Sequence, residues 1–244
     1  MKLSICSFDL CVDRFPLFLN FMTPSIDSAK IHPSSILEGD IELSENVTIG
    51  PLCYLKGPLS IGKNTVIGAG TIIGTEAEHR TKASNGSVSI GDNVTIKEGV
   101  VIHKGTENYI TLISDNCYIM NQSYVAHDCT LGKGVILSSN VCLAGKVHLL
   151  DGANLGMGVL VHQYVTIGAY CMIGMGSVVT KDVLPFSTSY GNPAVLKKWN
   201  THKLSELGIT MNDLKIESGN LTCPTHHPLV QKEITAFYQL SQRR

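Results

Sequence analysis

Four consecutive hexads open the repetitive part of this sequence: Ile31-His-Pro-Ser-Ser-Ile, Leu37-Glu-Gly-Asp-Ile-Glu, Leu43-Ser-Glu-Asn-Val-Thr and Ile49-Gly-Pro-Leu-Cys-Tyr. Each hexad begins with an aliphatic residue, and this spacing continues with two interruptions to about residue 184. The later positions are Leu55, Ile61, Ile67, Ile73, Ile90, Ile96, Ile102, Ile113, Ile119, Val125, Leu131, Leu137, Leu143, Leu149, Leu155, Val161, Ile167, Ile173 and Val179. So regular a period predicts a repeat architecture.

The six-residue period fits neither a helix nor an alternating strand, because periods of about 3.6 or 2 residues would place the aliphatic residues differently. Six residues instead make one short strand and one turn. The leading aliphatic side chain points inward, and a small residue two positions before the next one packs beside it, as at Val47, Thr65, Val94 and Val135. Three hexads form a triangular coil of about 18 residues, and stacked coils hydrogen-bond to one another. We therefore expect a mainly β protein, a parallel β-helix prism.

The flanks of the repeat differ from it, which predicts three segments. Residues 1–25 form an N-terminal extension of unclear role, residues 26–187 form the β-helix, and residues 188–244 form a C-terminal helical cap. Asp9, Asp13 and Arg14 interrupt the apolar content of the extension, so neither a secretory signal nor a membrane span is expected. Met22 leaves two interpretations open, a small cap or a start codon assigned too early.

The cap is expected to be helical and to protect the open edge of the prism. Residues Pro193 to Leu207 have helical spacing and are followed by Gly208, a signal for a helix end. Thr210-Met-Asn-Asp213 looks like a capping box that opens a second helix. A last helix is expected from Leu229 to about Leu240.

The composition narrows the class of protein. The chain has 244 residues, a net charge of −1 and a pI of about 6.7. It therefore lacks the excess of positive charge that would suggest nucleic-acid binding. Its eight cysteines have no CxxC spacing, and most lie inside hexads. We interpret them as reduced core thiols of a cytoplasmic protein. The hexad cysteines are Cys53, Cys117, Cys129, Cys142 and Cys171.

The two interruptions of the repeat are expected to be loops, because a β-helix accommodates extra chain only at its corners. They run from Thr75 to Ser89 and from Thr106 to Leu112. Long loops inside compact domains are often functional. A solvated excursion is the alternative. The first loop is rich in charged and polar side chains, namely Glu76, Glu78, His79, Arg80 and Lys82.

Several segments depart from generic hexads and carry a resemblance to a known family. They are Ile102-His-Lys-Gly-Thr106, Met120-Asn-Gln-Ser-Tyr-Val-Ala-His-Asp-Cys-Thr130, Leu143-Ala-Gly-Lys146, Val161-His-Gln163 and Tyr190-Gly-Asn-Pro193. Over roughly residues 30 to 208 the chain resembles the hexapeptide-repeat acyltransferases, and among them the UDP-N-acetylglucosamine O-acyltransferases that begin lipid A synthesis. The resemblance implies a left-handed β-helix, a homotrimer, acyl carrier protein and a nucleotide sugar as partners, and no cofactor besides the acyl donor.

His127 is the candidate catalytic base. A sugar hydroxyl is a poor nucleophile until its proton is removed, and an imidazole titrates in the range that suits this task. Asp128 adjoins His127 and could orient its ring. The resemblance implies the same two roles. It also implies that the N–H of Gly145 stabilises the tetrahedral intermediate, although Gly145 could equally be an ordinary corner glycine.

The resemblance further implies a set of substrate contacts. His103 falls at a comparable place but could be only a coil-surface histidine. Met175 matches a position that limits acyl length, where a methionine would shorten the groove that a glycine leaves open; a corner residue without ligand contact is the alternative. The expected substrate-binding residues are Glu78, Arg80, Tyr124, Lys146, His162, Gln163, Asn200 and Lys203.

Three positions depart from the family pattern. Tyr124 and Lys146 replace histidines, and Glu206 replaces an arginine near the nucleotide phosphates. A carboxylate there would repel a pyrophosphate. Either Lys146, Lys203 or Arg80 supplies the missing charge, or the sugar sits differently.

The leading hypothesis is therefore hydroxyacyl transfer from acyl carrier protein to the 3-hydroxyl of UDP-N-acetylglucosamine. An N-acyltransferase that acts on a nucleotide-linked amino sugar, with acetyl-CoA or acyl carrier protein as donor, is the alternative. A non-catalytic scaffold β-helix is a second alternative. A metalloenzyme like the γ-class carbonic anhydrases needs three converging histidines, and His103, His127 and His162 lack that spacing, so no metal is expected.

Overall fold

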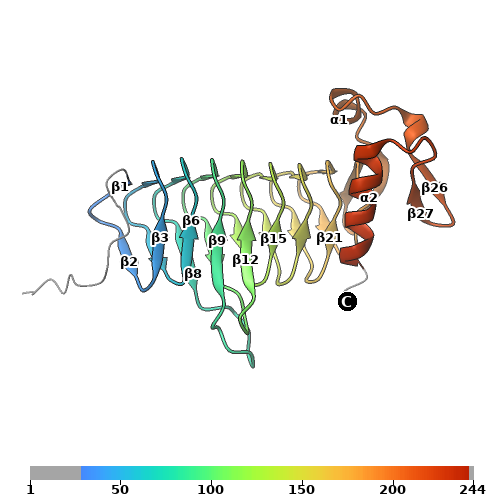
Figure 1. Ribbon diagram of the computed structural model, residues 1–244. Helices are drawn as coiled ribbons and strands as arrows, with labels where there is room; N and C mark the ends of the chain where they lie inside the picture. The colour runs from blue at the N-terminus through green and yellow to red at the C-terminus, as the bar shows by residue number, and fades with distance from the viewer. Residues whose placement is uncertain (1–28, 242–244) are drawn as a thin grey trace, which may run out of the picture.

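The computed structural model describes residues 29–241, in which the hexads form a three-sided parallel β-helix (Figure 1). The predicted prism is confirmed. Sheet A consists of β1 (Lys30–Ile31), β4 (Thr48–Ile49), β7 (Val66–Ile67), β10 (Thr95–Ile96), β13 (Tyr118–Ile119), β16 (Ile136–Leu137), β19 (Asn154–Leu155), β22 (Met172–Ile173), β24 (Ser187–Gly191) and β25 (Ala194–Trp199).

Sheet B consists of β2 (Ile36–Glu38), β5 (Tyr54–Lys56), β8 (Ile72–Thr75), β11 (Val101–His103), β14 (Tyr124–Val125), β17 (Cys142–Leu143), β20 (Leu160–Val161) and β23 (Val178–Val179). Sheet C consists of β3 (Ile41–Leu43), β6 (Leu59–Ile61), β9 (Ser87–Ile90), β12 (Ile110–Ile113), β15 (Thr130–Leu131), β18 (His148–Leu149) and β21 (Thr166–Ile167). The chain visits the sheets in the order A, B, C, so each coil has an A–B, a B–C and a C–A corner.

Strand register explains the buried ladders. In sheet A, Ile119 pairs with Leu137, Leu137 with Leu155, and Leu155 with Ile173, a step of 18 residues. Each side chain therefore lies over the one a coil earlier. The leading aliphatic residues from Ile49 to Val179 are all buried, and so are the small residues expected beside them.

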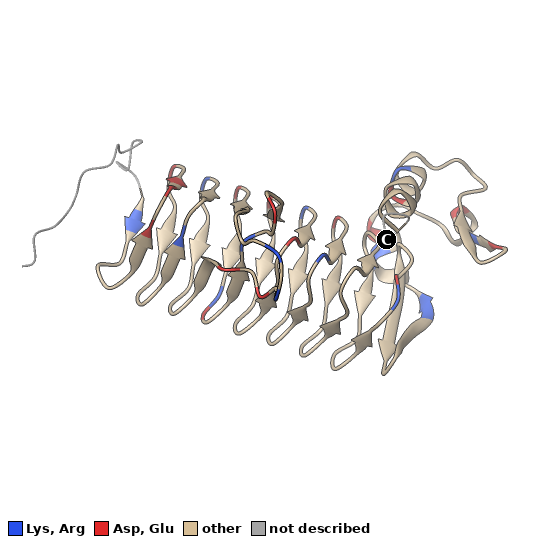
Figure 2. Cartoon of the chain, turned by 90° about the horizontal axis from the view of Figure 1, so that it is seen from below, with Lys and Arg blue, Asp and Glu red and all other residues tan. Residues whose placement is uncertain are grey.

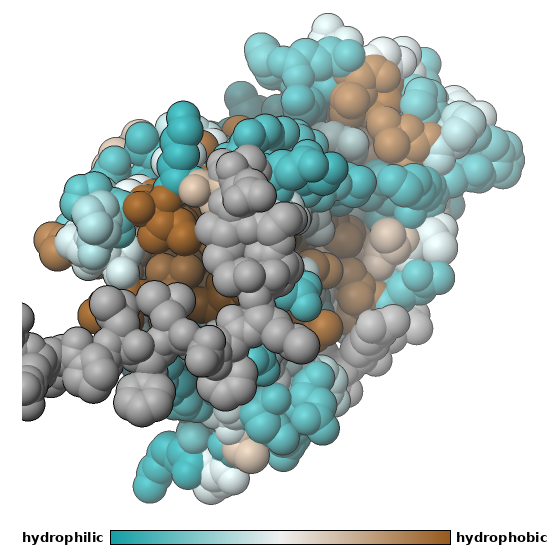
Figure 3. All heavy atoms as spheres, turned by 60° about the vertical axis from the view of Figure 1, so that its left-hand side comes forward, coloured by the Kyte–Doolittle hydropathy of each residue, from teal (hydrophilic) through white to brown (hydrophobic). Residues whose placement is uncertain are grey.

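At the N-terminal end, apolar side chains of the first coil remain accessible, including Ile36 and Leu37 (Figure 3). The predicted extension over residues 1–25 lies outside the described residues.

Lys, Arg, Asp and Glu gather mainly at the corners, in the loops and in the cap, which leaves the strand faces largely uncharged (Figure 2).

Both insertions leave the prism at the B–C corner, as Figure 1 shows for the segment that projects from β8 and β9. The first covers residues 76–86 and the second covers residues 104–109. Both loops were expected to extend too far toward the C-terminus, and the second begins two residues before Thr106. Ser87–Ser89 and Ile110–Leu112 are strand residues, because Ile110 pairs with Ser87 and Leu112 with Ser89 in sheet C. We call residues 76–86 the first loop.

The expected helix from Pro193 to Leu207 is wrong in its first half. Residues Ala194–Trp199 form β25, which pairs antiparallel with β24, while β24 extends sheet A next to β22. The unpaired edge of the last coil supplies hydrogen-bond partners that outweigh local helical spacing. Only α1 (Thr201–Glu206) is helical. Gly208 follows it at a φ of 68°, as predicted for a helix end.

The rest of the cap matches the prediction in part. Thr210 and Asp213 form the expected capping box, but it opens only a 3₁₀ turn, η1 (Met211–Asp213). A hairpin follows, β26 (Lys215–Glu217) and β27 (Asn220–Thr222). The last helix, α2 (Pro228–Ser241), is present as expected and packs beside β21. The cap has its own core of Phe186, Leu204, Ile209, Leu214, Leu221 and Val230.

The cysteines within residues 29–241 are all free thiols, and four of them are buried in the prism core. Desolvation raises the pKa of Cys117 and Cys171, each to about 11. No described helix combines the length and the apolar character needed to cross a membrane.

Candidate active site

His127 and Asp128 lie at the B–C corner, between β14 and β15. Asp128 takes a φ of 62°, the left-handed conformation that aspartate tolerates better than most residues. This turn brings its Oδ2 to 2.9 Å from Nδ1 of His127. Only 12% of the His127 side chain and 4% of the Asp128 side chain are exposed. The sequence neighbours thus form a shielded pair.

Thr106, in the second insertion, fixes the carboxylate of Asp128. Its N–H donates to Oδ1 at 2.7 Å and its hydroxyl donates to Oδ2 at 2.8 Å. The hydroxyl of Thr111 accepts the N–H of Asp128 at 3.0 Å. Burial alone would raise the pKa of Asp128. The hydrogen bonds from Thr106 and His127 outweigh burial and lower that pKa below its ordinary value.

An ionised Asp128 determines how the ring of His127 is used. A carboxylate only accepts hydrogen bonds, so Nδ1 of His127 carries the proton and donates it. Nε2 then holds the lone pair, and it is the nitrogen available to a ligand. This is the arrangement of a general base whose tautomer is set by a neighbouring carboxylate.

Gly145 lies over His127, one coil further along the B–C corner. The N–H of Lys146 donates to the carbonyl of His127 at 3.0 Å, which fixes this register. A β-carbon on Gly145 would come 2.6 Å from Cε1 and 2.7 Å from Nε2 of the imidazole. Gly145 is therefore required for space at this corner. Within residues 29–241 its own N–H donates to no protein acceptor, so it is free to bind a ligand.

Gln163 continues the same column after Gly145, since the N–H of Tyr164 donates to the carbonyl of Gly145 at 3.1 Å. His162 precedes it, and both side chains are exposed. With Tyr164 and Thr180 they line a cavity of about 330 Å³. The structure thus brings His127, Gly145, His162 and Gln163 onto one edge of the prism.

The first loop is held against the prism at its start. Glu76 Oε1 lies 3.2 Å from Nζ of both Lys56 and Lys104. The carbonyl of Glu76 lies 2.6 Å from Nδ1 of His103. His103 is 7% exposed and Lys104 also 7%, so the alternative of a coil-surface histidine is wrong. His103 instead helps to anchor the loop.

Tyr124 anchors the loop two residues further on. Its hydroxyl donates to Oε2 of Glu78 at 2.9 Å, and its ring packs against His103 with centroids 5.3 Å apart. Burial, reinforced by the bond to Glu78, raises the pKa of Tyr124, so the phenol stays protonated and remains a donor. Tyr124 and Glu78 were both expected to bind substrate, and in the structure they bind each other.

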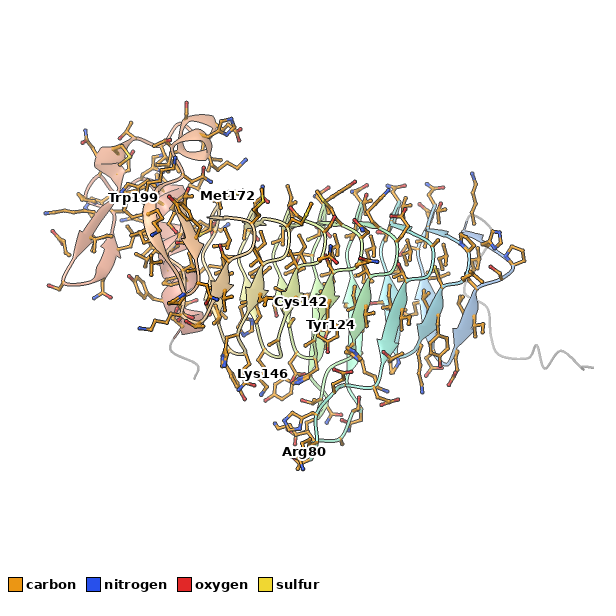
Figure 4. The ribbon with its side chains drawn as sticks, turned by 180° about the vertical axis from the view of Figure 1, so that it is seen from behind. Arg80, Tyr124, Cys142, Lys146, Met172 and Trp199 are labelled. Carbon is orange, nitrogen blue, oxygen red and sulfur yellow. The ribbon has the colours of Figure 1, made fainter. Side chains whose placement is uncertain are left out.

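Arg80 lies at the projecting end of the loop, and Lys146 lies at the corner on the same side of the prism (Figure 4). Nζ of Lys146 lies 5.3 Å from the ring centre of Tyr109 and 5.4 Å from that of Tyr164. Both contacts are of the cation–π type. Aromatic rings hold Lys146 without neutralising its charge, which leaves it able to attract an anion.

Asn200 and Lys203 lie on a different edge. They line a cavity of about 560 Å³ at the C–A corner, together with Lys133, Gly152, Asn154, Tyr170, Met172, His202 and Glu206. The amide of Asn200 donates to the carbonyl of Tyr170 at 3.0 Å, and its oxygen caps α1. A single chain therefore does not bring Asn200 and Lys203 to His127.

Glu206, which replaces the arginine of the family pattern, is not an isolated negative charge. Its carboxylate lies 2.6 Å from Nζ of Lys203 and 3.1 Å from Nδ1 of His202. The hydrogen bond from Lys203 lowers the pKa of Glu206. The ammonium group of Lys203 compensates the carboxylate, and the repulsion of a phosphate is weaker than the sequence alone indicates.

Met175 lies at the A–B corner with 79% of its surface exposed. It follows Met157 by one coil, since the N–H of Gly176 donates to the carbonyl of Met157 at 2.8 Å. Sheet B separates this corner from His127. On the outer face of sheet B, Tyr124 is followed in successive coils by Cys142, Leu160 and Val178, so an apolar strip runs along the sheet from the coil of His127 to the coil of Met175.

Two residues of this edge were not predicted. Thr106 was seen only as the end of a motif, and its two hydrogen bonds to Asp128 depend on the path of the second insertion. His79 was seen only as part of a polar loop, yet its ring centre lies 5.5 Å from that of His127. Among the described side chains, no group of three or more His, Cys, Asp or Glu is arranged to hold a metal ion.

Comparisons with known proteins agree on one family. The model for bacterial transferase hexapeptide repeats matches residues 40–75 and 110–145. An acyl-(acyl-carrier-protein)–UDP-N-acetylglucosamine O-acyltransferase of Sinorhizobium medicae is 40% identical over 202 residues, which cover 74% of this chain and 75% of that protein. One from Bartonella henselae is 31% identical and covers 89% and 88%. The solved UDP-N-acetylglucosamine acyltransferase of Campylobacter jejuni superposes with a TM-score of 0.65 at 33% identity, covering 72% of this chain and 77% of that one.

We predict that Gly145→Ala displaces the imidazole of His127 without unfolding the prism. The added methyl group needs the space that Cε1 and Nε2 occupy, and the side chain of His127 can rotate away more easily than the backbone can move. A crystal structure of the variant should have the 2.9 Å contact between His127 and Asp128 broken, with an unchanged melting temperature within a few degrees. An undisturbed imidazole would contradict the packing described for this corner.

Proposed function

Because this chain belongs to the acyl-(acyl-carrier-protein)–UDP-N-acetylglucosamine O-acyltransferase family, we propose that it transfers a hydroxyacyl group from acyl carrier protein to the 3-hydroxyl of UDP-N-acetylglucosamine. His127 is the general base. The observation that carries this proposal is the pair formed by His127 and the fixed carboxylate of Asp128, beneath a glycine with an unused N–H. No cofactor is needed beyond the acyl donor, and the reaction belongs to the cytoplasm at the start of lipid A synthesis.

The proposed chemistry uses each of these groups once. Nε2 of His127 takes the proton of the hydroxyl while its oxygen attacks the thioester carbonyl. The carbonyl oxygen becomes an anion, and the N–H of Gly145 donates to it. The intermediate collapses to the ester, and the departing thiolate takes the proton back from the imidazolium. Asp128 stabilises that imidazolium in between.

The nucleotide end of the substrate needs positive charge, for which Lys203, Lys146 and Arg80 are the candidates. Lys203 lines the cavity of the C–A corner, beside the compensated Glu206. Lys146 and Arg80 lie on the B–C side. His162 and Gln163 are proposed to contact the sugar, since they lie in the same column as the base.

These groups lie on two edges of one chain, which supports a homotrimer with shared sites. A head-to-tail contact that closes into a ring uses two different surfaces of each chain. The B–C corner of one chain can then face the C–A corner of its neighbour. Each site would combine His127 of one chain with Lys203 of the next, and Asn200 would serve by holding α1 in place.

The acyl chain is proposed to follow the apolar strip of sheet B from His127 toward Met175. Cys142 and Leu160 offer it apolar side chains, of which Leu160 is 47% exposed. Met175 at the far corner would end the groove. A methionine there favours acyl chains of about ten carbons or fewer, because filled groove contributes about 0.8 kcal/mol per methylene.

The direct test is the reaction itself. With purified protein, a panel of acyl donors and nucleotide sugars, and mass detection, we expect acyl-UDP-N-acetylglucosamine as the product. His127→Ala should lower kcat by roughly 10²- to 10⁴-fold, and Asp128→Asn by less. His226→Ala, at an exposed histidine of the cap, is the control and should change little. Product only from acetyl-CoA and an amino sugar, with an active His127→Ala variant, would favour N-acyl transfer.

Mixed trimers test the shared site. We expect His127→Ala and Lys203→Glu chains to be nearly inactive alone. When they are mixed in equal amounts, half of the sites receive an intact His127 and half of those an intact Lys203, so about a quarter of the wild-type activity should return. Activity assays after refolding the mixture measure this. No recovery, or a fully active monomer in sedimentation, would contradict a site formed between chains.

The acyl groove is tested by Met175→Gly. Removing the side chain should lengthen the groove by about two to four carbons, which corresponds to a shift in preference of roughly 10- to 200-fold toward longer donors. Competition between donors of different length measures the shift, and short donors should still react. An unchanged length profile would mean that Met175 does not line the groove.

A further inference from the structure

The first loop brings a second imidazole to the candidate base. The ring centres of His79 and His127 lie 5.5 Å apart, and their planes are inclined by 75°, which is an edge-on contact. Neither the sequence motifs nor the proposed mechanism uses His79. Because His127 is otherwise bounded by Asp128 and Gly145, His79 forms a third wall beside the base.

The position of His79 is fixed by the loop that carries it. On one side, Glu78 is bound by Tyr124 at 2.9 Å. On the other, Nζ of Lys82 lies 2.8 Å from the carboxylate of Glu107, in the second insertion. Glu78 before His79 is thus tied to the prism, and Lys82 after it is tied to the second insertion. The contact with His127 is part of a braced structure.

The hydrogen bonds of His79 determine which of its nitrogens can bind a ligand. Nδ1 accepts the N–H of Thr81 at 3.3 Å and that of Lys82 at 3.1 Å. A nitrogen that accepts hydrogen bonds carries no proton in the neutral ring, so the proton resides on Nε2. Nε2 lies on the other side of the ring from these bonds. Within residues 29–241 its N–H has no protein acceptor, and the side chain is exposed.

The proposed reaction has no such donor directly beside the base, because Gln163, which is proposed to contact the sugar with His162, lies two coils beyond His127. A sugar offers several similar hydroxyls, and a base that only accepts a proton does not by itself determine which of them approaches it. A hydrogen-bond donor at a fixed distance from the base can orient the ring, because it binds an oxygen adjacent to the one that reacts.

We propose that His79 is this donor: its Nε2–H binds an oxygen of the acceptor sugar next to the hydroxyl that His127 deprotonates, and so determines which hydroxyl is acylated. The proposal rests on the proposed acyl transfer to a nucleotide sugar. It makes His79 a specificity-determining residue that touches the substrate and exchanges no proton with it.

Two substitutions separate the donor from the packing. His79→Gln keeps a donor of similar reach, whereas His79→Phe keeps a flat ring against His127 but has no N–H. With UDP-N-acetylglucosamine we expect His79→Phe to lower kcat/KM about 10- to 100-fold and to release product acylated at a second hydroxyl. His79→Gln should stay within several-fold of the wild type and keep one product. NMR of the products identifies the acylated position.

Two controls accompany these variants: a substitution far from the site and a measurement of stability. His226→Phe replaces an exposed histidine of the cap and should change neither rate nor product. Melting temperatures of all variants show whether the loop has remained folded. If His79→Phe keeps the wild-type rate and a single product, or if His79→Gln loses as much as His79→Phe, the ring acts by packing alone and the proposal is overturned.

The tautomer of His79 gives a test that does not depend on activity. In protein labelled with ¹⁵N in its histidines, the two ring nitrogens differ in chemical shift, and assignment by His79→Gln identifies the signal. A proton on Nε2 supports the proposal, and a proton on Nδ1 overturns it. Should the wild type acylate no nucleotide sugar at all, the proposed function fails, while this measurement still decides whether His79 presents a donor.

Discussion

Parallel register between successive coils is the constraint on which the rest of this molecule depends. Each coil hydrogen-bonds to the next with a step of 18 residues, so a residue at one corner lies directly over its counterpart a coil earlier. The same ladder that buries the aliphatic core therefore stacks His127, Gly145 and Gln163 in one column. Core packing and site geometry follow from a single backbone arrangement.

The insertions add what stacking alone cannot supply. The stacked hexads place Gly145 and Gln163 in the column of His127, but they supply neither a group that holds the carboxylate of Asp128 nor a wall beside the imidazole. Thr106 in one insertion and His79 in the other bring these to His127. Ion pairs at Glu76 and Lys82 tie the insertions to the prism and to each other, but their carboxylates are about half exposed, so each pair contributes little to stability. The side chains that surround the His127–Asp128 pair thus come largely from the places where the repeat is broken.

Sequence reasoning reached the parts of the structure that depend on local periodicity. The hexads predicted the prism and its buried ladders, and the motif around His127 predicted the pair with Asp128. It failed at Ala194–Trp199, where an unpaired sheet edge converts helical spacing into a strand. It also missed His79, because no periodicity relates a loop residue to the corner on which it packs. Asn200 and Lys203 were expected to bind substrate, and the sequence did not show that they lie on a different edge of the prism from His127.

The hairpin of β24 and β25 occupies the edge at which sheet A would otherwise continue. A stack of identical coils has no intrinsic end, and its last open strand is a template for another molecule to continue it. Here β24 takes that place from the chain itself. The outer strand, β25, carries Lys197 and Lys198, and the register between the two strands shifts at Thr188/Ser189. Charge and irregularity on an outermost strand oppose further pairing, so this end of sheet A is a poor template for a strand of another molecule.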